Sequence, residues 1–276
     1  MNLGIIHGEP AEIYHASDAV GSHKLNDLSP YPLLFKKRYV TREIPADAAT
    51  PAMAFGRYFH TLSLEGEEAA KREYVVAPKC DRRTTEGKAR WAGFLEQAQG
   101  MTVIDEADMT LAWRMVQSIR EKPSAVKLLS TGKPEVTFRH QLASFAIQAR
   151  VDWFIDEPKD APMIVDVKTV DELAAFDAHY LTFSYYRQAA FYRLVVAKLC
   201  GLETFQPQVC YLVVEKKEPF QVAIRIPDAE SLAVGTKEVM ADLAKLKDCY
   251  DSGIWPGEPD EARSVSLPEW KTRQSL

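Results

Sequence analysis

The stretch Ile164-Val165-Asp166-Val167-Lys168-Thr169 alternates apolar and polar residues, a pattern typical of a β-strand. Because strand side chains alternate between two faces, Asp166 and Lys168 should project from the same face. A second strand-like run, 149–155, carries Asp152 among large apolar side chains. The residues between the runs, 156–162, are polar and contain proline, which predicts a turn. We therefore expect a hairpin that brings two carboxylates and one ammonium to one end of a sheet.

Carboxylates that converge with few other charges nearby repel one another, and a bound divalent cation is the usual remedy. Asp152 is flanked by Val151, Trp153 and Phe154, where a carboxylate is costly to bury without a partner or a metal. These residues suggest a site for a hard metal ion in a hydrolase. The competing interpretation is a surface ion pair, because Asp and Lys two apart on an exposed strand are common.

The composition is that of an ordinary soluble globular protein, with 276 residues, 46% hydrophobic and 26% charged. No run approaches the roughly 18–20 apolar residues of a membrane helix, and the start lacks the features of a signal peptide. We therefore expect a cytoplasmic protein with no membrane partner. The four cysteines are far apart, which argues against a disulfide framework and against a zinc or iron–sulfur site: Cys80, Cys200, Cys210 and Cys249.

The net charge of −5 argues at first against a nucleic-acid partner. The distribution matters more than the sum, because two local basic clusters could bind phosphates. One consists of Lys36, Lys37, Arg38 and Arg42, and the other of Arg82, Arg83, Lys88 and Arg90. Each cluster could equally be a solvated surface, so both interpretations stay open.

The hydrophobic periodicity changes from helical to strand-like near residue 131. After an irregular start over 1–20, the expected elements are helices at 22–28, 33–40, 53–65, 86–98, 105–120 and 122–130, with a short strand at 73–77. Next come strands at 135–139, 145–155 and 163–169, a helix at 183–199, strands at 208–215 and 220–226, and a helix at 228–251. This order predicts an α/β fold with a mixed central β-sheet flanked by helices. We expect one domain over 1–276, with a mainly helical part (1–130), a sheet part (131–251) and an irregular tail (252–276).

Four more polar residues fall where they could join the hairpin carboxylates. His60 lies one helical turn after Gly56, and Glu135 lies on the strand before the hairpin. Gln188 and Tyr192 are four apart, so they share one helix face. Each has an ordinary alternative: a histidine on an amphipathic helix is more often a core or surface residue, and an amide and a phenol can simply cap a packed helix.

In order and spacing, these motifs resemble those of RecB-like nucleases in the PD-(D/E)xK superfamily. The matching positions are Gly56 to His60, Asp152, Asp166 with Lys168, and Gln188 to Tyr192. Within that superfamily, nearly the whole chain resembles nuclease domains of the exonuclease VIII (RecE) type, found in phages and prophages. That narrower resemblance rests on Ser22-His23-Lys24-Leu25, Ser29-Pro30, the His60 to Glu65 segment, Gly253-Ile254-Trp255-Pro256-Gly257 and Leu267-Pro268-Glu269-Trp270. The residue before Asp152 is Val151 rather than proline, and the cysteines do not supply the cluster of the iron–sulfur branch.

The resemblance assigns roles to the motif residues. It implies that Asp152 and Asp166 bind Mg²⁺, for which Mn²⁺ can substitute, with the Val167 carbonyl and His60 as additional ligands. Lys168 would orient the attacking water and stabilise developing charge, while Glu135 would either complete the catalytic carboxylates or be an ordinary strand residue. The residues expected to contact DNA are Gln188, Tyr192 and, more weakly, Arg187.

The activity implied by the resemblance is 5′→3′ degradation of one strand of linear double-stranded DNA, which leaves 3′ single-stranded tails. A single-strand annealing protein would use those tails in recombination. The implied assembly is a ring-shaped homotetramer around DNA, which would let an acidic subunit present a basic inner wall. Two alternatives stay open: a structure-specific or flap endonuclease of the same fold, and a DNA-end-binding scaffold without catalysis.

Overall fold

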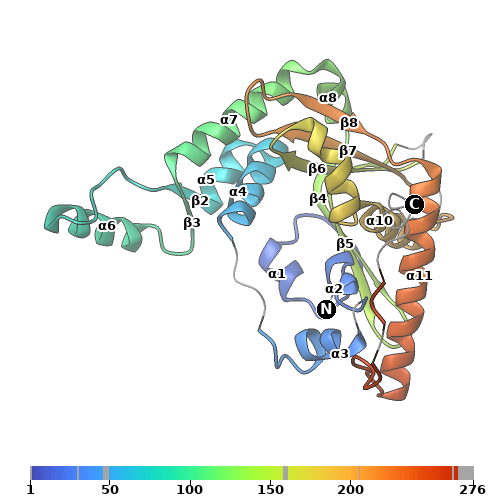
Figure 1. Cartoon of the computed structure of the whole chain (residues 1–276). Helices are drawn as coiled ribbons and strands as arrows, with labels where there is room; N and C mark the ends of the chain where they lie inside the picture. Colours follow the sequence, from blue (N-terminus) through green and yellow to red (C-terminus); the bar gives the residue numbers. More distant parts are fainter. Residues whose placement is uncertain are drawn as a thin grey trace.

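A six-stranded mixed sheet organises the computed structural model, which describes residues 2–29, 31–45, 50–157, 161–204, 206–262 and 264–266 (Figure 1). The sheet order is β1-β4-β5-β6-β7-β8, and only the β6–β7 pair is parallel. The strands are β1 (Gly4–Ile6), β4 (Lys133–Gln141), β5 (Ala146–Ile155), β6 (Met163–Val170), β7 (Gln208–Glu215) and β8 (Val222–Arg225). The mixed α/β sheet is therefore confirmed, and so is the antiparallel hairpin of β5 and β6. Residues 158–160 of its expected turn lie outside the described residues.

Helices cover both faces of the sheet, and each face has its own hydrophobic core. Ile164 of β6 packs into the core formed with the first helix group, whereas Val165 and Val167 pack into the core formed with the second. Because β6 is buried on both faces, it is apolar at nearly every position except its two charged residues. The first group is α2 (Ser22–Asn26), α3 (Pro32–Phe35), α10 (Tyr185–Cys200) and α11 (Ala229–Ser252), and the second is α4 (Pro51–His60), α7 (Glu106–Glu121) and α8 (Pro123–Leu128).

The helices α10 and α11 lie unusually close together, and a glycine makes this possible. A Cβ atom added to Gly235 of α11 would lie 2.6 Å from the Tyr186 carbonyl oxygen and 3.1 Å from the Ala190 Cβ. Any larger residue would push α11 away from α10 and thin the core beneath it. The helix α10 is also the crossover between the parallel strands β6 and β7.

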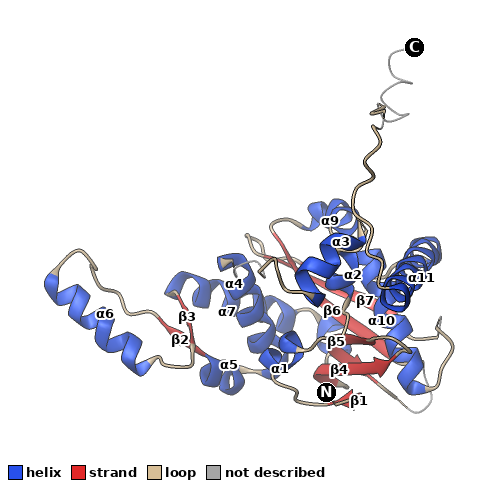
Figure 2. Cartoon of the chain, turned by 90° about the horizontal axis from the view of Figure 1, so that it is seen from below, coloured by secondary structure: helices blue, strands red, loops and turns tan. Residues whose placement is uncertain are grey.

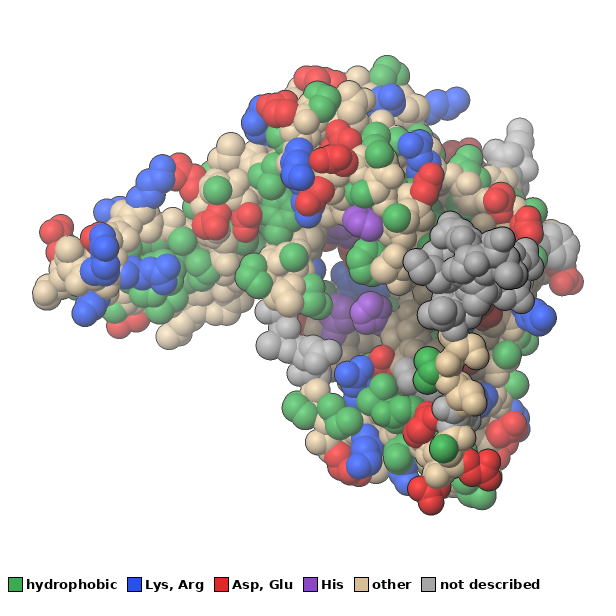
Figure 3. Space-filling view, in the orientation of Figure 1, with side chains coloured by type: hydrophobic (Ala, Val, Ile, Leu, Met, Phe, Trp, Pro, Cys, Tyr) green, Lys and Arg blue, Asp and Glu red, His purple; other side chains and the backbone are tan. Residues whose placement is uncertain are grey.

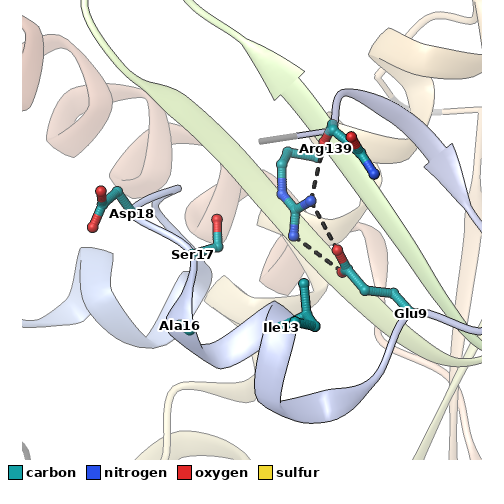
Figure 4. A pocket seen from close by; sticks show the side chains of 7 residues that line it. Glu9, Ile13, Ala16, Ser17, Asp18 and Arg139 are labelled. Atoms are coloured by element: carbon teal, nitrogen blue, oxygen red, sulfur yellow. Dashed lines mark hydrogen bonds and ion pairs between the residues drawn. The ribbon is translucent and has the colours of Figure 1, made fainter.

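The N-terminal segment is ordered, contrary to the expected irregular start. Its strand β1 pairs with β4, and α1 (Ala11–Ala16) follows. A buried ion pair fixes this segment to the sheet: Arg139 of β4 donates two hydrogen bonds of 3.0 Å to the Glu9 carboxylate (Figure 4). Arg139 also donates to Gln148 Oε1 at 2.9 Å, which leaves this buried guanidinium well satisfied.

One part of the chain projects away from the sheet. After α5 (Glu67–Glu73), the strands β2 (Tyr74–Val76) and β3 (Thr102–Ile104) pair in parallel, and the chain between them forms α6 (Thr85–Gln97). Both views show α6 standing clear of the other helices (Figures 1 and 2). We call residues 77–101 the arm.

The remaining segments pack around the C-terminal half of the sheet. After β6 come a 3₁₀ turn, η3 (Leu173–Ala175), and α9 (Phe176–Thr182), neither expected as a separate element. In the tail, Trp255 stacks on Phe35 with ring centroids 6.0 Å apart. Two motifs of the narrower resemblance are not fully covered, because Pro30 and Leu267–Trp270 lie outside the described residues. All four cysteines are free thiols, and no described helix is long and apolar enough to cross a membrane.

Candidate active site

The two aspartates of the hairpin lie where the β5–β6 ladder ends. The last paired residues on this side are Trp153 and Val165, so Asp152 and Asp166 lie just beyond the pairing. Here the Val167 N–H donates a hydrogen bond of 2.7 Å to Asp152 Oδ2. The strand β5 also shifts its alternation at this point, because Val151 packs in the α10-side core and Trp153 in the α4-side core. Because of this shift, the Asp152 carboxylate, in place of a backbone carbonyl of β5, accepts the hydrogen bond from the Val167 N–H.

Glu135 lies opposite Asp152 and adopts an uncommon backbone conformation. The register pairs Pro134 with Trp153 and Val136 with Val151, which places Glu135 between those pairs. Its φ of 51° lies in the left-handed region, which costs a residue with a side chain about 1–2 kcal/mol. Strain of this kind concentrates at functional sites, where surrounding structure holds the residue in place.

His60 completes a group of three possible metal ligands. It is the last residue of α4, and a π-helical turn, η2 (Thr61–Glu65), follows it directly. Such π-helical turns are frequent at functional sites. The His60 Nδ1 lies 3.5 Å from Asp152 Oδ2, and one ligand atom each from His60, Glu135 and Asp152 lie within 4.8 Å of one another.

The ion pair of Lys168 and Asp166 lies beside this group. Lys168 Nζ is 2.6 Å from Asp166 Oδ2, and the aspartate is only 3% exposed. Burial lowers the pKa of Lys168, but the Asp166 and Asp152 carboxylates outweigh burial, so the pKa is raised above its usual value. Lys168 Nζ also lies 4.6 Å from the centre of the Tyr185 ring. Lys168 therefore carries a positive charge at neutral pH and can only donate hydrogen bonds.

The electrostatics of Asp152 fit a cation in this place. Burial raises the pKa of Asp152 to about 7, the Asp166 and Glu135 carboxylates add to the rise, and His60 and Lys168 oppose it. A carboxyl group with such a pKa gains from any nearby positive charge. Carboxylate oxygens and an imidazole nitrogen within 4.8 Å of one another are a suitable donor set for a divalent metal ion. The residues present therefore fit a divalent metal.

The group of possible metal ligands that converges here overlaps only in part with the predicted ligands. Among the described residues, the group that converges contains His60 and Glu135 beside Asp152, whereas Asp166 is not one of its members. Asp166 makes its close contact with Lys168. Val167 contacts the site through its N–H, and metal binding by its carbonyl stays a prediction.

Gln188 and Tyr192 share one face of α10, as their spacing predicts, but they differ in depth. The Gln188 Nε2 donates a hydrogen bond of 3.2 Å to the Tyr192 hydroxyl. Tyr192 is buried, and its pKa is raised by burial and by the nearby Asp166 and Asp152 carboxylates. Tyr192 therefore lies beneath the carboxylates, which argues against the expected DNA contact, while Gln188 lines an open cavity.

Arg187 was expected to contact DNA, and its placement argues against that role. Its side chain is 11% exposed, and three partners bind its guanidinium. Nε donates to Asn26 Oδ1 at 3.2 Å, Nη1 to Glu238 Oε2 at 2.9 Å and Nη2 to Asp242 Oδ2 at 2.5 Å. These contacts join α2, α10 and α11, so Arg187 supports the wall of the site.

A cavity of about 770 Å³ opens beside Lys168. Its lining comes from α2, the α9–α10 junction and α10, including His23, Ser184, Tyr185 and Gln188. In the space-filling view, the face around the middle of the molecule is hollowed, and histidine side chains lie in that hollow (Figure 3). The charged residues of the site thus adjoin a space large enough for a small ligand or part of a polymer.

Comparison with protein-family models identifies the family of this chain. The family described as "PDDEXK-like domain of unknown function (DUF3799)" matches residues 37–268. The chain belongs to this family. The PDDEXK-like family lies in the PD-(D/E)xK nuclease superfamily, which confirms the broader resemblance read from the motifs.

One solved structure shares this fold. A protein described as a putative exonuclease from Eubacterium rectale aligns over 98% of this chain and 100% of that chain, with a TM-score of 0.61 and 12% identity. At that identity the likeness shows the fold alone. The structure of SSO0001 aligns over 74% of this chain and 95% of that chain at 13% identity, and its TM-score of 0.29 carries no argument. No match was found among curated proteins.

The sequence prediction missed two residues of this PDDEXK-like site. Arg150 forms an ion pair with Glu135 through Nε and donates a hydrogen bond of 2.8 Å to the Glu9 carbonyl oxygen. Tyr185 lies under the Lys168 ammonium. The position of Arg150, two residues before Asp152 on the same strand, is a signal that could have been used. The position of Tyr185 depends on how α10 packs on β6, which has no local signal.

Proposed function

We propose that this PDDEXK-like domain is a metal-dependent exodeoxyribonuclease that degrades one strand of linear double-stranded DNA. The single observation that carries the proposal is the position of the half-buried Lys168 ammonium beside three converging side chains that could bind a metal. Phosphodiester hydrolysis needs an activated water and compensation for the charge that develops on the phosphate. This site offers residues for both needs.

The metal would be held by His60, Glu135 and Asp152, with Asp166 as a neighbouring carboxylate. Mg²⁺ is the proposed ion, with Mn²⁺ as a substitute. When bound, such an ion lowers the pKa of a water ligand and withdraws charge from the phosphate. The Val167 N–H fixes Asp152 Oδ2, the oxygen that lies 3.5 Å from His60 Nδ1.

Lys168 would act as a hydrogen-bond donor in this reaction. The Asp166 and Asp152 carboxylates raise its pKa, which favours the ammonium form and so a hydrogen-bond donor. Its position next to Asp166 and the cavity suits contact with the attacking water or a phosphate oxygen. Asp166 holds the ammonium in place, while Tyr185 covers its other side.

The finer parts of the proposal rest on the motif resemblance to nucleases of the exonuclease VIII (RecE) type. They are 5′→3′ polarity, 3′ single-stranded products, a single-strand annealing partner and a tetrameric ring. An exonuclease is also in keeping with the name of the Eubacterium rectale protein of the same fold. The open cavity beside Lys168, with Gln188 on its wall, suits the end of a DNA strand.

Digestion of DNA labelled at one 5′ or one 3′ end, with a closed circular duplex beside it, tests this function. With Mg²⁺ we expect the 5′ label to be released first from linear DNA, with the circle intact. Asp166→Asn is the matched inactive control, since it keeps the shape of the side chain. Cutting of the circle would indicate an endonuclease, and binding of ends without cleavage in Mg²⁺ or Mn²⁺ would indicate a scaffold.

A further inference from the structure

The second basic cluster of the sequence lies on the arm, and the structure gives it a different setting from the first. In the first cluster, Arg38 pairs with Asp27, Lys37 with Glu43 and Arg42 with Asp18. Those charges are largely neutralised by neighbours. On the arm, Arg82, Lys88 and Arg90 are exposed and form no ion pair with any described residue.

The arm is a built element rather than a loose loop. Thr84 caps α6 by accepting a hydrogen bond of 3.0 Å from the Gly87 N–H. A Cβ atom on Gly87 would lie 1.9 Å from the Asp81 carbonyl oxygen, so the loop packs directly on the helix at this glycine. Arg82 lies over the Trp91 ring at 4.3 Å, which fixes its guanidinium on the surface. The basic side chains are therefore presented on a defined scaffold.

The helix α6 contributes little to the hydrophobic cores. Gly87 is its only buried residue, and Leu95 is 45% exposed. In the space-filling view, Lys and Arg side chains gather on the visible face of the arm, next to hydrophobic side chains (Figure 3). By helical spacing, Lys88 and Arg90 flank the apolar stripe of Trp91 and Leu95 on its two sides. The helix α6 therefore adds little to the hydrophobic cores and presents unpaired cations to solvent, which suits binding of a negatively charged partner.

The arm is attached to the element that carries a metal ligand. His60 ends α4, and the chain then runs through η2 and α5 into β2, which directly precedes the arm. The strands β2 and β3 at the base of the arm pack in the same hydrophobic core as α4. With 13 residues, α6 is about 20 Å long, which equals roughly six base pairs of duplex DNA.

We propose that the arm binds the phosphate backbone of double-stranded DNA beyond the base pairs that occupy the active site, through Arg82, Lys88 and Arg90. This proposal rests on the proposed nuclease function and adds to it the path of the duplex. Charge complementarity decides the partner: a chain with a net charge of −5 places three exposed, unpaired cations on one projecting element. Such contacts hold DNA without regard to its sequence.

The test uses the full chain and two open-ended duplexes of about 10 and about 40 base pairs, since the longer one extends well beyond the base pairs that occupy the active site. Binding is measured by fluorescence anisotropy at several KCl concentrations with Ca²⁺ present, and cleavage with Mg²⁺. The variant is R82Q/K88Q/R90Q. The matched control, K198Q/K237Q/K245Q, removes the same charge from exposed lysines of α10 and α11.

We expect the arm variant to bind the long duplex at least about tenfold more weakly at low salt, with a salt slope reduced by about 2–3. Binding of the short duplex and its maximal cleavage rate should stay within about twofold of wild type. The control should leave the salt slope unchanged. Equal losses on both duplexes, or an unchanged slope, would overturn the proposal.

A further measurement separates DNA from a second copy of the chain as the partner. If Leu95→Asp lowers the mass in sedimentation and the triple variant binds DNA normally, the arm is a subunit contact and the proposal fails. The readouts are also separate from those of the proposed function. A wild-type chain that cleaves nothing refutes the nuclease, whereas the salt slope of binding still decides whether the arm holds the duplex.

Discussion

The edge of the sheet at β5–β6 and the arm both carry lysine or arginine, but in opposite surroundings. The Lys168 ammonium contacts the Asp166 carboxylate and faces the Tyr185 ring, and its side chain is 17% exposed. Arg82, Lys88 and Arg90 stand in water without ion pairs among the described residues. A buried charge acts strongly on its close neighbours, whereas exposed charges act weakly, additively and in a salt-dependent way. The same residue type is thus suited to chemistry in one place and to binding in the other.

The largest effect should come from removing the buried charge. Lys168→Met is expected to lower kcat by about 10²–10⁴, because it removes the donor beside the reacting phosphate. Single-turnover cleavage with saturating linear duplex measures it. Neutralising Lys88 alone should change kcat by less than about twofold. If both variants lowered kcat equally, the contrast between a catalytic Lys168 and a DNA-binding arm would be wrong.

Arg187 tests whether a buried arginine near the cavity supports the fold or the DNA. Arg187→Met removes the ion-pair partner of Asp242 and of the partly exposed Glu238. We therefore expect a loss of about 2–3 kcal/mol in the free energy of unfolding. Urea denaturation measures this, with Lys88→Met as the exposed control. A salt slope of DNA binding that falls by about one, with stability unchanged, would restore Arg187 as a phosphate contact.

The pH dependence of metal binding should follow Asp152. Its pKa in the folded metal-free chain, about 7, exceeds the ordinary value of 3.8 for an aspartic acid, so the folded state holds this proton more tightly than the unfolded state. The stability of the metal-free chain should therefore fall as pH rises from about 4 to about 7. A bound cation removes this penalty. Mg²⁺ should raise Tm by a few degrees at pH 8 and scarcely at pH 5.5, and Asp152→Asn should abolish the difference.

The smallest effect is expected at the base of the arm helix. Gly87→Ala would force the Asp81 backbone away from α6, yet the arm adds little to the hydrophobic cores. We expect faster hydrogen exchange over 81–97 with a change in Tm below about 2 °C. A large drop in Tm would show that the arm is part of the cooperative fold and not a peripheral binding element.

Periodicity predicted the sheet and the long helices because these elements are long enough to show their repeat. The three central strands, α7, α10 and α11 are all found within a few residues of the predicted bounds. The strands β1 and β3 were missed, whereas the equally short β2 was predicted; three residues are too few to show a dependable alternation, and β1 and β3 exist through pairing with distant strands. Local sequence carries no trace of such pairing.

The candidate site was predictable only in part, for a related reason. The ion pair of Asp166 and Lys168 follows from the strand period alone. The burial of Arg187 could not be predicted from local sequence, because its partners Glu238 and Asp242 lie 51 and 55 positions away. The left-handed backbone of Glu135 could not be predicted either, because it depends on how β4 pairs with β5.

The buried pair of Glu9 and Arg139 bears on where this domain can be cut. The family match starts at residue 37, yet Glu9 supplies the carboxylate that neutralises a guanidinium 2% exposed within β4. A version trimmed to the matched range would leave Arg139 as a buried cation without its counter-ion, at a cost of about 3–5 kcal/mol. The range matched by the family model thus leaves out the residue that completes this ion pair, and recombinant fragments should keep β1 and α1.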